Sequence, residues 1–487
     1  MNAIICKKTV VTVLFAVICL YAGAQDFAGF RTGNYNGVNG VFFNPANIAD
    51  SRYRFDLNLF SLNAVVGNNQ ASFKLGDLGH SFNGDSLKNQ VFGKNAGPAS
   101  GLASISLQGP SLMFNIGKLS FALSTRGRVV TNISNIDGKL FQKISQDFQT
   151  DPALPYTIQS GNDMRLNVIG WTEYGFSVAR QLSSPQDKNL FKMGVTIKYL
   201  QGVGNAYLNI NNFTGTLNQD NVTLKNYLTG TTGHIALGFS GGTFSNFTLD
   251  QLTKGSGSGI GGDIGFVYEI RRNDSMHRAG RDENKYRLKI GVALLDLGSI
   301  LFTRDVQRSG AYDIHVTGVQ KYYLSDLSGV TIDNYNQHFQ ASPQYFTPTT
   351  DNGSTYSTSL PTTLQLNLDY NIHRGFYLDF GGQIAMSSAT GKPYNPEYFN
   401  AFTVTPRFEG RAIGLYVPIN YNELTKFNAG LSVRLGPLFF GSGSILTSLF
   451  SSSKQADLHI GFHIAGLQHR NREAKPAPAD TSPTPNN

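Results

Sequence analysis

The chain has 487 residues, of which 15% are charged and 12% are aromatic, with 40 Lys and Arg against 32 Asp and Glu. Soluble domains usually contain about 25% charged residues. The small positive excess is dispersed along the chain, without the basic stripe that nucleic-acid binding requires. We therefore expect no nucleic acid among the partners of this protein.

Residues 1–24 have the pattern of a secretory signal peptide. Lys7 and Lys8 precede an apolar stretch over 10–20, and Ala22-Gly23-Ala24 is a small-residue cleavage site. A membrane anchor is the competing interpretation, but the apolar run is shorter than the ~18 residues that a spanning helix needs. We expect an exported chain that begins near Gln25.

The segment 25–53 is predicted to be a compact N-terminal unit ahead of the first strand. It contains "GVFFNPANIAD", in which Phe42 and Phe43 run into Asn44, Pro45 and Asn47. Proline fixes its own φ and disfavours a helical conformation at the residue before it. The two asparagines can satisfy nearby backbone groups as Asx turns. An ordinary capped turn leading into a strand is the simpler interpretation of the same residues.

From residue 54 to 466 the main pattern is a period of two, which is typical of strands with two different faces. In "KLSFALSTRGR", for example, Leu119, Phe121 and Leu123 alternate with polar or small residues. The pattern predicts fourteen strands. They cover residues 54–64, 104–115, 118–130, 166–180, 190–203, 260–271, 286–297, 361–371, 376–386, 402–409, 411–421, 427–435, 438–443 and 456–466.

Alternation alone does not distinguish a soluble sandwich, with its apolar face inside, from a membrane barrel, with its apolar face toward lipid. Most of the predicted strands approach the ~9–11 residues that cross a bilayer at a tilt. Long and short connections also alternate, which is typical of outer-membrane barrels. The predicted fold class is therefore all-β: a transmembrane antiparallel β-barrel of about 14 strands.

In such a barrel the polar face of each strand points into the lumen. The charged residues expected to face the lumen are Arg126, Arg128, Lys192, Lys198, Glu269, Asp369 and Arg434. An even number of strands places both termini on the periplasmic side. The stretch 467–487 is polar and rich in proline, so we expect a disordered periplasmic tail.

We expect no enzymatic activity, no cofactor and no metal site. Both cysteines, Cys6 and Cys19, lie in the signal peptide, so the mature chain has no disulfide and no thiolate ligand. His459 and His463 share a face of the last strand but stand ~13 Å apart by strand rise, too far to chelate one metal ion. No G-x-S-x-G nucleophile motif occurs.

Three stretches carry a resemblance to a known family. They are "GVNGVFFNPANIAD" after the signal peptide, "GVALLDLGSI" at Gly291 to Ile300 and "NAGLSVRLGPLFFGSGS" at Asn428 to Ser444. They resemble the FadL-type long-chain fatty-acid transporters and the PorV-like barrels of the Bacteroidota type IX secretion system. The last two resemble strands of an uncharacterised Bacteroidota branch of that group.

The resemblance implies a barrel in the outer-membrane lipid whose N-terminal segment folds into the mouth as a plug. Phe42, Phe43, Asn44, Pro45 and Asn47 would belong to that plug and offer surface to a ligand. The function it implies is passive uptake of hydrophobic or small ligands. The alternative is a barrel that does not transport and instead serves as a docking or accessory component of a secretion or surface-protein machinery.

Overall fold

The computed structural model describes residues 26–76, 98–140, 154–159, 163–183, 189–241, 255–271, 284–331, 334–349 and 353–468. The predicted signal peptide and nearly all of the predicted tail lie outside these ranges. None of the helices within them is long and apolar enough to cross a membrane. The strands of the described chain form one continuous antiparallel sheet.

That sheet closes on itself because the first strand, β1, pairs with the last, β23. The closed ring has fourteen positions, as predicted, since β2 with β3, β18 with β19 and β20 with β21 are each one wall strand interrupted at a single point. The wall strands are β1 (Tyr53–Asn68), β2 (Ala99–Gln108), β3 (Ser111–Ile116), β4 (Leu119–Ile136), β6 (Met164–Gln181), β7 (Asn189–Gln219), β9 (Gly257–Arg271), β10 (Tyr286–Thr303), β15 (Thr363–His373), β16 (Phe376–Ala385), β17 (Ala401–Glu409), β18 (Ile413–Tyr416), β19 (Ile419–Asn422), β20 (Lys426–Ala429), β21 (Leu431–Leu435), β22 (Leu438–Ser442) and β23 (Gln455–Leu467).

The apolar face of the wall strands points outward and the polar face points inward. Leu123 and Ile197 are 58% and 64% exposed, whereas Arg126 and Lys198 on the same strands are buried inside the ring. A closed sheet with an apolar outer surface and a polar interior is the arrangement of a transmembrane barrel. The soluble sandwich, which would bury the apolar face, is therefore the wrong alternative.

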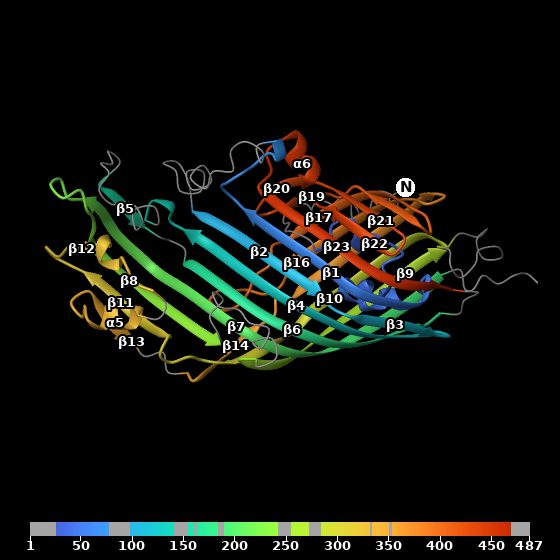
Figure 1. The fold of residues 1–487 in the computed structure, drawn as a ribbon, viewed down its shortest axis with the longest axis horizontal. Coiled ribbons are helices and arrows are strands. Elements are labelled where there is room, and N and C mark those ends of the chain that lie inside the picture. The colour runs from blue at the N-terminus through green and yellow to red at the C-terminus, as the bar shows by residue number, and fades with distance from the viewer. Residues whose placement is uncertain are drawn as a thin grey trace, which may run out of the picture.

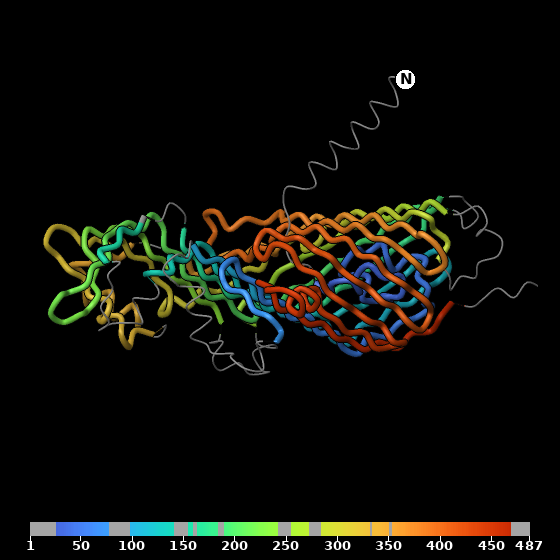
Figure 2. Tube along the Cα trace, turned by 90° about the horizontal axis from the view of Figure 1, so that it is seen from above, coloured from blue at the N-terminus to red at the C-terminus, as the bar shows by residue number. Residues whose placement is uncertain are grey.

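The two ends of the barrel differ in their connections. At one end tight turns join β3 to β4, β15 to β16 and β21 to β22, with glycines at positive φ such as Gly117 and Gly436. This short-turn end also holds the start of β1 and the end of β23. Figure 2 shows the N-terminal segment (blue) inside the barrel near this end. Most connections at the opposite end are longer, although only residues 423–425 join β19 to β20.

The largest difference from the predicted strands lies in β7. We predicted that this strand ends at residue 203, but it continues to Gln219 and is 31 residues long. Beyond Gly202 it leaves its wall neighbour β9 and pairs with β8 instead. The predicted loops 204–259 and 298–360 therefore contain regular structure. A separate apolar cluster stabilises this extension. The cluster is built mainly from the extension's own side chains, and Ala99, Ile136 and Met164 of the barrel strands complete it.

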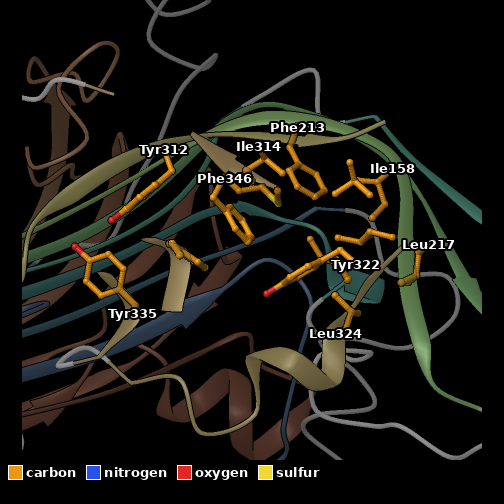
Figure 3. Close-up of a cluster of buried hydrophobic side chains, with 14 of the residues drawn as sticks. Ile158, Phe213, Leu217, Tyr312, Ile314, Tyr322, Leu324, Tyr335 and Phe346 are labelled. Atoms are coloured by element: carbon orange, nitrogen blue, oxygen red, sulfur yellow. The ribbon is translucent and has the colours of Figure 1, made fainter. Parts of the chain in front are cut away.

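We call this extension the lobe; Figure 1 shows it at the end of the molecule away from the short turns. It consists of residues 204–219 of β7 with β5 (Tyr156–Gln159), β8 (Asn226–Gly241), β11 (Gly310–Val316), β12 (Tyr322–Tyr323), β13 (Phe346–Thr349), η7 (Leu324–Leu327) and α5 (Tyr335–Gln340). Side chains from these elements converge in one buried cluster that includes Phe213, Ile314, Tyr322 and Phe346 (Figure 3). The remaining elements at this end are β14 (Thr355–Ser359), which pairs with β10, and α6 (Ile445–Phe450).

Candidate functional site

Residues 26–52 fill the short-turn half of the lumen, and we call them the plug. They fold into three short 3-10 turns, η1 (Phe30–Thr32), η2 (Gly37–Phe42) and η3 (Pro45–Ile48). Glycines at positive φ and the proline at the start of η3 prevent one continuous helix. Apolar plug residues pack together and against Met113, Ala122 and Phe439 of the wall.

The Asn44-Pro45 turn joins the plug to the barrel wall. The Asn44 side chain caps η3 by accepting the Ala46 N–H at 2.9 Å. Its amide nitrogen donates to the backbone carbonyls of Phe266 on β9, at 3.1 Å, and Val292 on β10, at 3.3 Å. One side chain therefore terminates the turn and also pairs with two adjacent wall strands.

The wall beneath this turn is made of glycine. A Cβ atom on Gly194 would lie 2.4–2.5 Å from the backbone of Pro45, and one on Gly265 would lie 2.1 Å from Oδ1 of Asn44. Real side chains do not approach so closely, so only glycine lets the turn rest on the wall. We predicted that the turn matters, but we did not predict its contact with these glycines of β7 and β9.

The two phenylalanines before the turn are buried between the plug and the side chains of the lumen. Phe42 is 8% exposed, and the Arg126 guanidinium lies 4.7 Å from its ring centroid. Phe43 is 7% exposed, contacts Phe27 edge to face at 6.1 Å and has Arg31 above its ring at 5.2 Å. Asn47, the last of the predicted plug residues, lines two small cavities beside the plug.

Above the plug a network of charged side chains crosses the middle of the lumen. Arg126 Nη2 lies 2.7 Å from Glu173 Oε2, and Arg128 Nη1 lies 2.7 Å from Asp296 Oδ2. Lys198 Nζ lies 2.7 Å from both Asp263 and Asp296. We call these six residues the charge network. Its three cations and three carboxylates are all buried and paired, as charges away from water must be.

The other predicted lumen residues lie nearer the short-turn end. Lys192 pairs with Glu269 at 2.5 Å. Asp369 accepts from Arg407 at 2.7 Å and from the Tyr286 hydroxyl at 2.5 Å. The structure thus places all seven predicted charged residues inside the barrel, each with a local partner.

Arg434, the last of the seven, is fully buried. It donates to the carbonyls of Gly410 and Arg411 at 2.6 and 3.0 Å and lies over the Tyr35 ring at 4.7 Å. The histidines of β23 are also in the lumen: His463 lies 2.6 Å from Asp56, whose second oxygen accepts the Val38 N–H of the plug at 2.6 Å.

The connection between β16 and β17 also enters the lumen, from the long-loop end. We call residues 386–400 the strap. The Glu397 carboxylate pairs with Arg165 on β6, and the Glu397 backbone exchanges two hydrogen bonds with Asn132, at 2.8 and 2.9 Å. The Tyr398 hydroxyl accepts from Arg128 at 2.6 Å. The strap therefore closes the barrel above the charge network, whereas we predicted an ordinary outer loop.

Aromatic side chains surround the place where the strap enters. Tyr394 of the strap lies 5.6 Å from Tyr207 and 5.1 Å from Tyr356, which stacks on Phe302 at 5.9 Å. Trp171 lies in the same buried cluster, and its indole donates to Glu173 of the charge network at 2.8 Å. We call this the mouth cluster. Its side chains fill the junction of barrel and lobe, where Trp171, Tyr207 and Phe302 are at most 4% exposed.

Sequence reasoning named the three cations of the charge network but none of its three carboxylates. Glu173 and Asp263 lie on the inward face of predicted strands, so the period of two was sufficient to find them. Asp296 follows a bulge in β10 and has φ of 58°, so the alternation shifts just before it. Nothing in the sequence of the strap distinguishes it from a surface loop.

Residues 45–443 match a family of unknown function, DUF5723. The chain belongs to this family. No curated protein matches it.

Three solved structures resemble the fold at low identity. The Ralstonia pickettii toluene transporter TbuX is 12% identical, with 92% of this chain and 97% of that chain covered and a TM-score of 0.40. A Pseudomonas aeruginosa FadL homologue is 10% identical, with 91% and 98% covered and a TM-score of 0.39. A deletion mutant of the monoaromatic hydrocarbon channel TodX is 10% identical, with 92% and 98% covered and a TM-score of 0.33.

Proposed function

We propose that this DUF5723 protein is an outer-membrane barrel for the passive uptake of small hydrophobic molecules. The observation that carries the proposal is the mouth cluster, which places Trp171, Tyr207, Phe302, Tyr356 and Tyr394 where the lobe meets the lumen. These rings are buried while Tyr394 of the strap packs on them. Movement of the strap therefore uncovers aromatic surface that binds apolar solutes through burial and ring contacts.

The proposed orientation follows from the two ends of the barrel. The short-turn end, with the plug, faces the periplasm, and the lobe faces outward, as in barrels with short periplasmic turns and long external loops. Exposed apolar side chains on the wall, such as Leu123 and Ile197, meet the lipid. Both ends of the mature chain are then periplasmic.

Passage requires two closures to move. The strap is joined to β4 and β6 by the Glu397–Arg165 ion pair, two hydrogen bonds with the Asn132 side chain and the Tyr398 hydroxyl. Further hydrogen bonds link Asn395 to Ser359 and Asn400 to Ala385. The plug is continuous with the wall at Tyr53 and otherwise rests on the wall by non-covalent contacts. Beyond the charge network, a captured molecule meets the rings of Phe42 and Phe43, over which the guanidinium groups of Arg126 and Arg31 lie.

Deletion of residues 30–47 tests the role of the plug. The wall strands pair with one another without the plug, so the deletion leaves a closed barrel. In liposomes we expect faster entry of toluene, the ligand named for TbuX, and of a long-chain fatty acid. Replacing Asn44-Pro45 with Gly-Gly is the milder variant, because freeing the backbone costs only about 1 kcal/mol.

A second candidate function is docking of a partner protein through the lobe. It is favoured by the charge network and strap, which fill the lumen above the plug, and by a lobe with its own core. Unchanged entry of both probes after deletion of the plug contradicts the uptake proposal and leaves docking as the better account. Faster entry of toluene from the intact protein than from empty liposomes contradicts a purely docking role.

A further inference from the structure

Three small polar cavities lie along the plug. The first two lie against β10, β15 and β16, and the third lies against β7, β9 and β10. The first, of about 30 Å³, is at mid-barrel beneath Tyr398 of the strap. The second, of about 40 Å³, lies beside Asn44 and Asp379. The third, also of about 40 Å³, lies toward the short-turn end beside Asp50 and Arg52. Each has room for two or three water molecules and polar groups to bind them.

Neighbouring cavities share their lining residues. The first and second share Arg31, Phe43 and Gln365. The second and third share Gly33, Asn47 and Lys289. The three cavities therefore form a row from mid-lumen to the short-turn end, separated by two necks. We call this row the seam.

Arg31 stands at the first neck without a carboxylate partner. Its guanidinium donates to Gln365 Oε1 at 2.8 Å and covers the ring of Phe43. Within the described ranges, no carboxylate lies within 4 Å of it, whereas Lys192 and Arg126 each have one at 2.5–2.7 Å. Asp26 and Asp379 oppose its charge at longer range, and without a contact ion pair the guanidinium still contributes to the local potential for a passing ion.

The second neck and the middle cavity add one charge each. Lys289 at the second neck lies 3.4 Å from Asp369. Asp379 in the middle cavity is fully buried, and its Oδ2 accepts from the Asn367 amide. Its Oδ1 has no hydrogen-bond partner in the part of the chain that the structure describes. Each neck thus carries a cation, while the unpaired carboxylate lies in the wider space between them.

We infer that the seam is a pathway for water and small inorganic anions that passes the plug while the plug stays in place. Side chains at the narrowest points of a pore decide which sign of charge crosses it, so Arg31 and Lys289 favour anions. The Arg31–Gln365 hydrogen bond is the gate, because it joins the plug to β15 across the first neck. This pathway is independent of hydrophobic uptake, which needs the plug to move.

The test is the current through the purified full-length protein in a planar bilayer with a KCl gradient. We expect small currents with a reversal potential nearer that of Cl⁻ than that of K⁺. Arg31→Gln shortens the side chain and removes the charge, so conductance rises roughly two-fold or more and selectivity shifts toward K⁺. Asp379→Asn shifts selectivity in the opposite direction, toward Cl⁻.

Arg434→Gln is the matched control, since it removes a buried lumen arginine that lines none of the three cavities. We expect its reversal potential to equal that of the wild type. Each measurement is repeated on proteins that also carry Glu397→Ala, which releases the strap from Arg165. No current from Arg31→Gln in that released protein would overturn the inference.

Equal reversal potentials for Arg31→Gln, Asp379→Asn and wild type would also overturn it, because the seam would then not carry the current. Toluene entry into liposomes is measured on the same preparations. Equal reversal potentials with normal toluene entry would contradict the seam alone. Altered reversal potentials without toluene entry would contradict the uptake proposal alone.

Discussion

The plug and the lobe are held in place by different kinds of contact. The lobe buries a large cluster of aromatic and aliphatic side chains of its own, including Phe213, Phe339 and Phe346. The plug buries Phe27 and Phe30 against wall residues, and wall glycines and amide groups receive its central turn. Most of the apolar surface that stabilises the lobe is therefore contributed by the lobe itself, whereas the plug is stable only inside this barrel.

The largest expected effect is in the lobe core. Phe346 stacks on Phe339 at 4.3 Å, and Phe346→Ala leaves a cavity there that costs about 3–5 kcal/mol. We expect faster hydrogen exchange in β11 and β13 and no change in the heat-modifiable migration of the barrel. Val319→Ala, at a 98% exposed position of the same region, is the control and leaves exchange unchanged. Loss of the folded barrel in Phe346→Ala would mean that the barrel depends on the lobe and that the two are not separately stabilised.

The next effect tests the glycine wall under the plug. Gly265→Ala places a methyl group where Asn44 Oδ1 now lies, and overpacking of this kind costs about 1–3 kcal/mol. We expect the plug to become sensitive to protease while the wall stays folded. The same change at Gly291 is the control, because its Cβ would meet its nearest neighbours at an ordinary 3.5 Å. Equal protease sensitivity of the two variants would disprove the special role of Gly265.

A smaller effect is expected from the Asn44 side chain alone. Asn44→Ala removes the cap of η3 and two hydrogen bonds to wall carbonyls but keeps Pro45. Loss of a helix cap costs about 1 kcal/mol, and the hydrogen bonds add to it. Hydrogen exchange at Ala46 to Ile48 should rise several-fold without release of the plug. Unaltered exchange there would show that the proline alone holds the turn.

The smallest expected effect is a pH dependence in the lobe. Partial burial raises the pKa of Asp305, but the hydrogen bonds and charge of Arg308 outweigh it and hold the pKa below its usual range. The stabilisation is therefore present above the unfolded-state value of about 3.9 and is lost as pH falls through the lower folded value. We expect lobe exchange to rise below about pH 4, and Asp305→Asn to reduce that dependence. Plug exchange at Ala46 serves as the internal reference.

The sequence predicted the wall well because lipid imposes a simple rule. Every wall strand must alternate, so the fourteen strands and the inward position of Arg126 or Lys198 follow from a period of two. The carboxylate partners of those charges were not predicted. Glu173 stands directly opposite Arg126 on the next wall strand, whereas Asp296 on β10 reaches Arg128 only across the closed ring.

The strap and the lobe could not be predicted in the same way. The strap enters the lumen because Glu397 meets Arg165 and Asn132, which lie more than 230 positions away along the chain. The lobe alternates as the wall does, but its apolar face is buried against α5 and β13 instead of lipid. In both places the position of the segment is determined by residues far away in the sequence, which a local pattern does not identify.

The pairing of β1 with β23 also fixes an order of assembly. The strand that begins the ring must wait for the last strand to be made, and until then both edges expose unpaired backbone groups. The plug precedes β1 in the chain, so it is available to line the inner face of the curving sheet before the ring closes. His463 of β23 reaches Asp56 of β1, and Asp56 holds the Val38 N–H of the plug. The final strand thus meets a surface that is complete only when the plug is already in place.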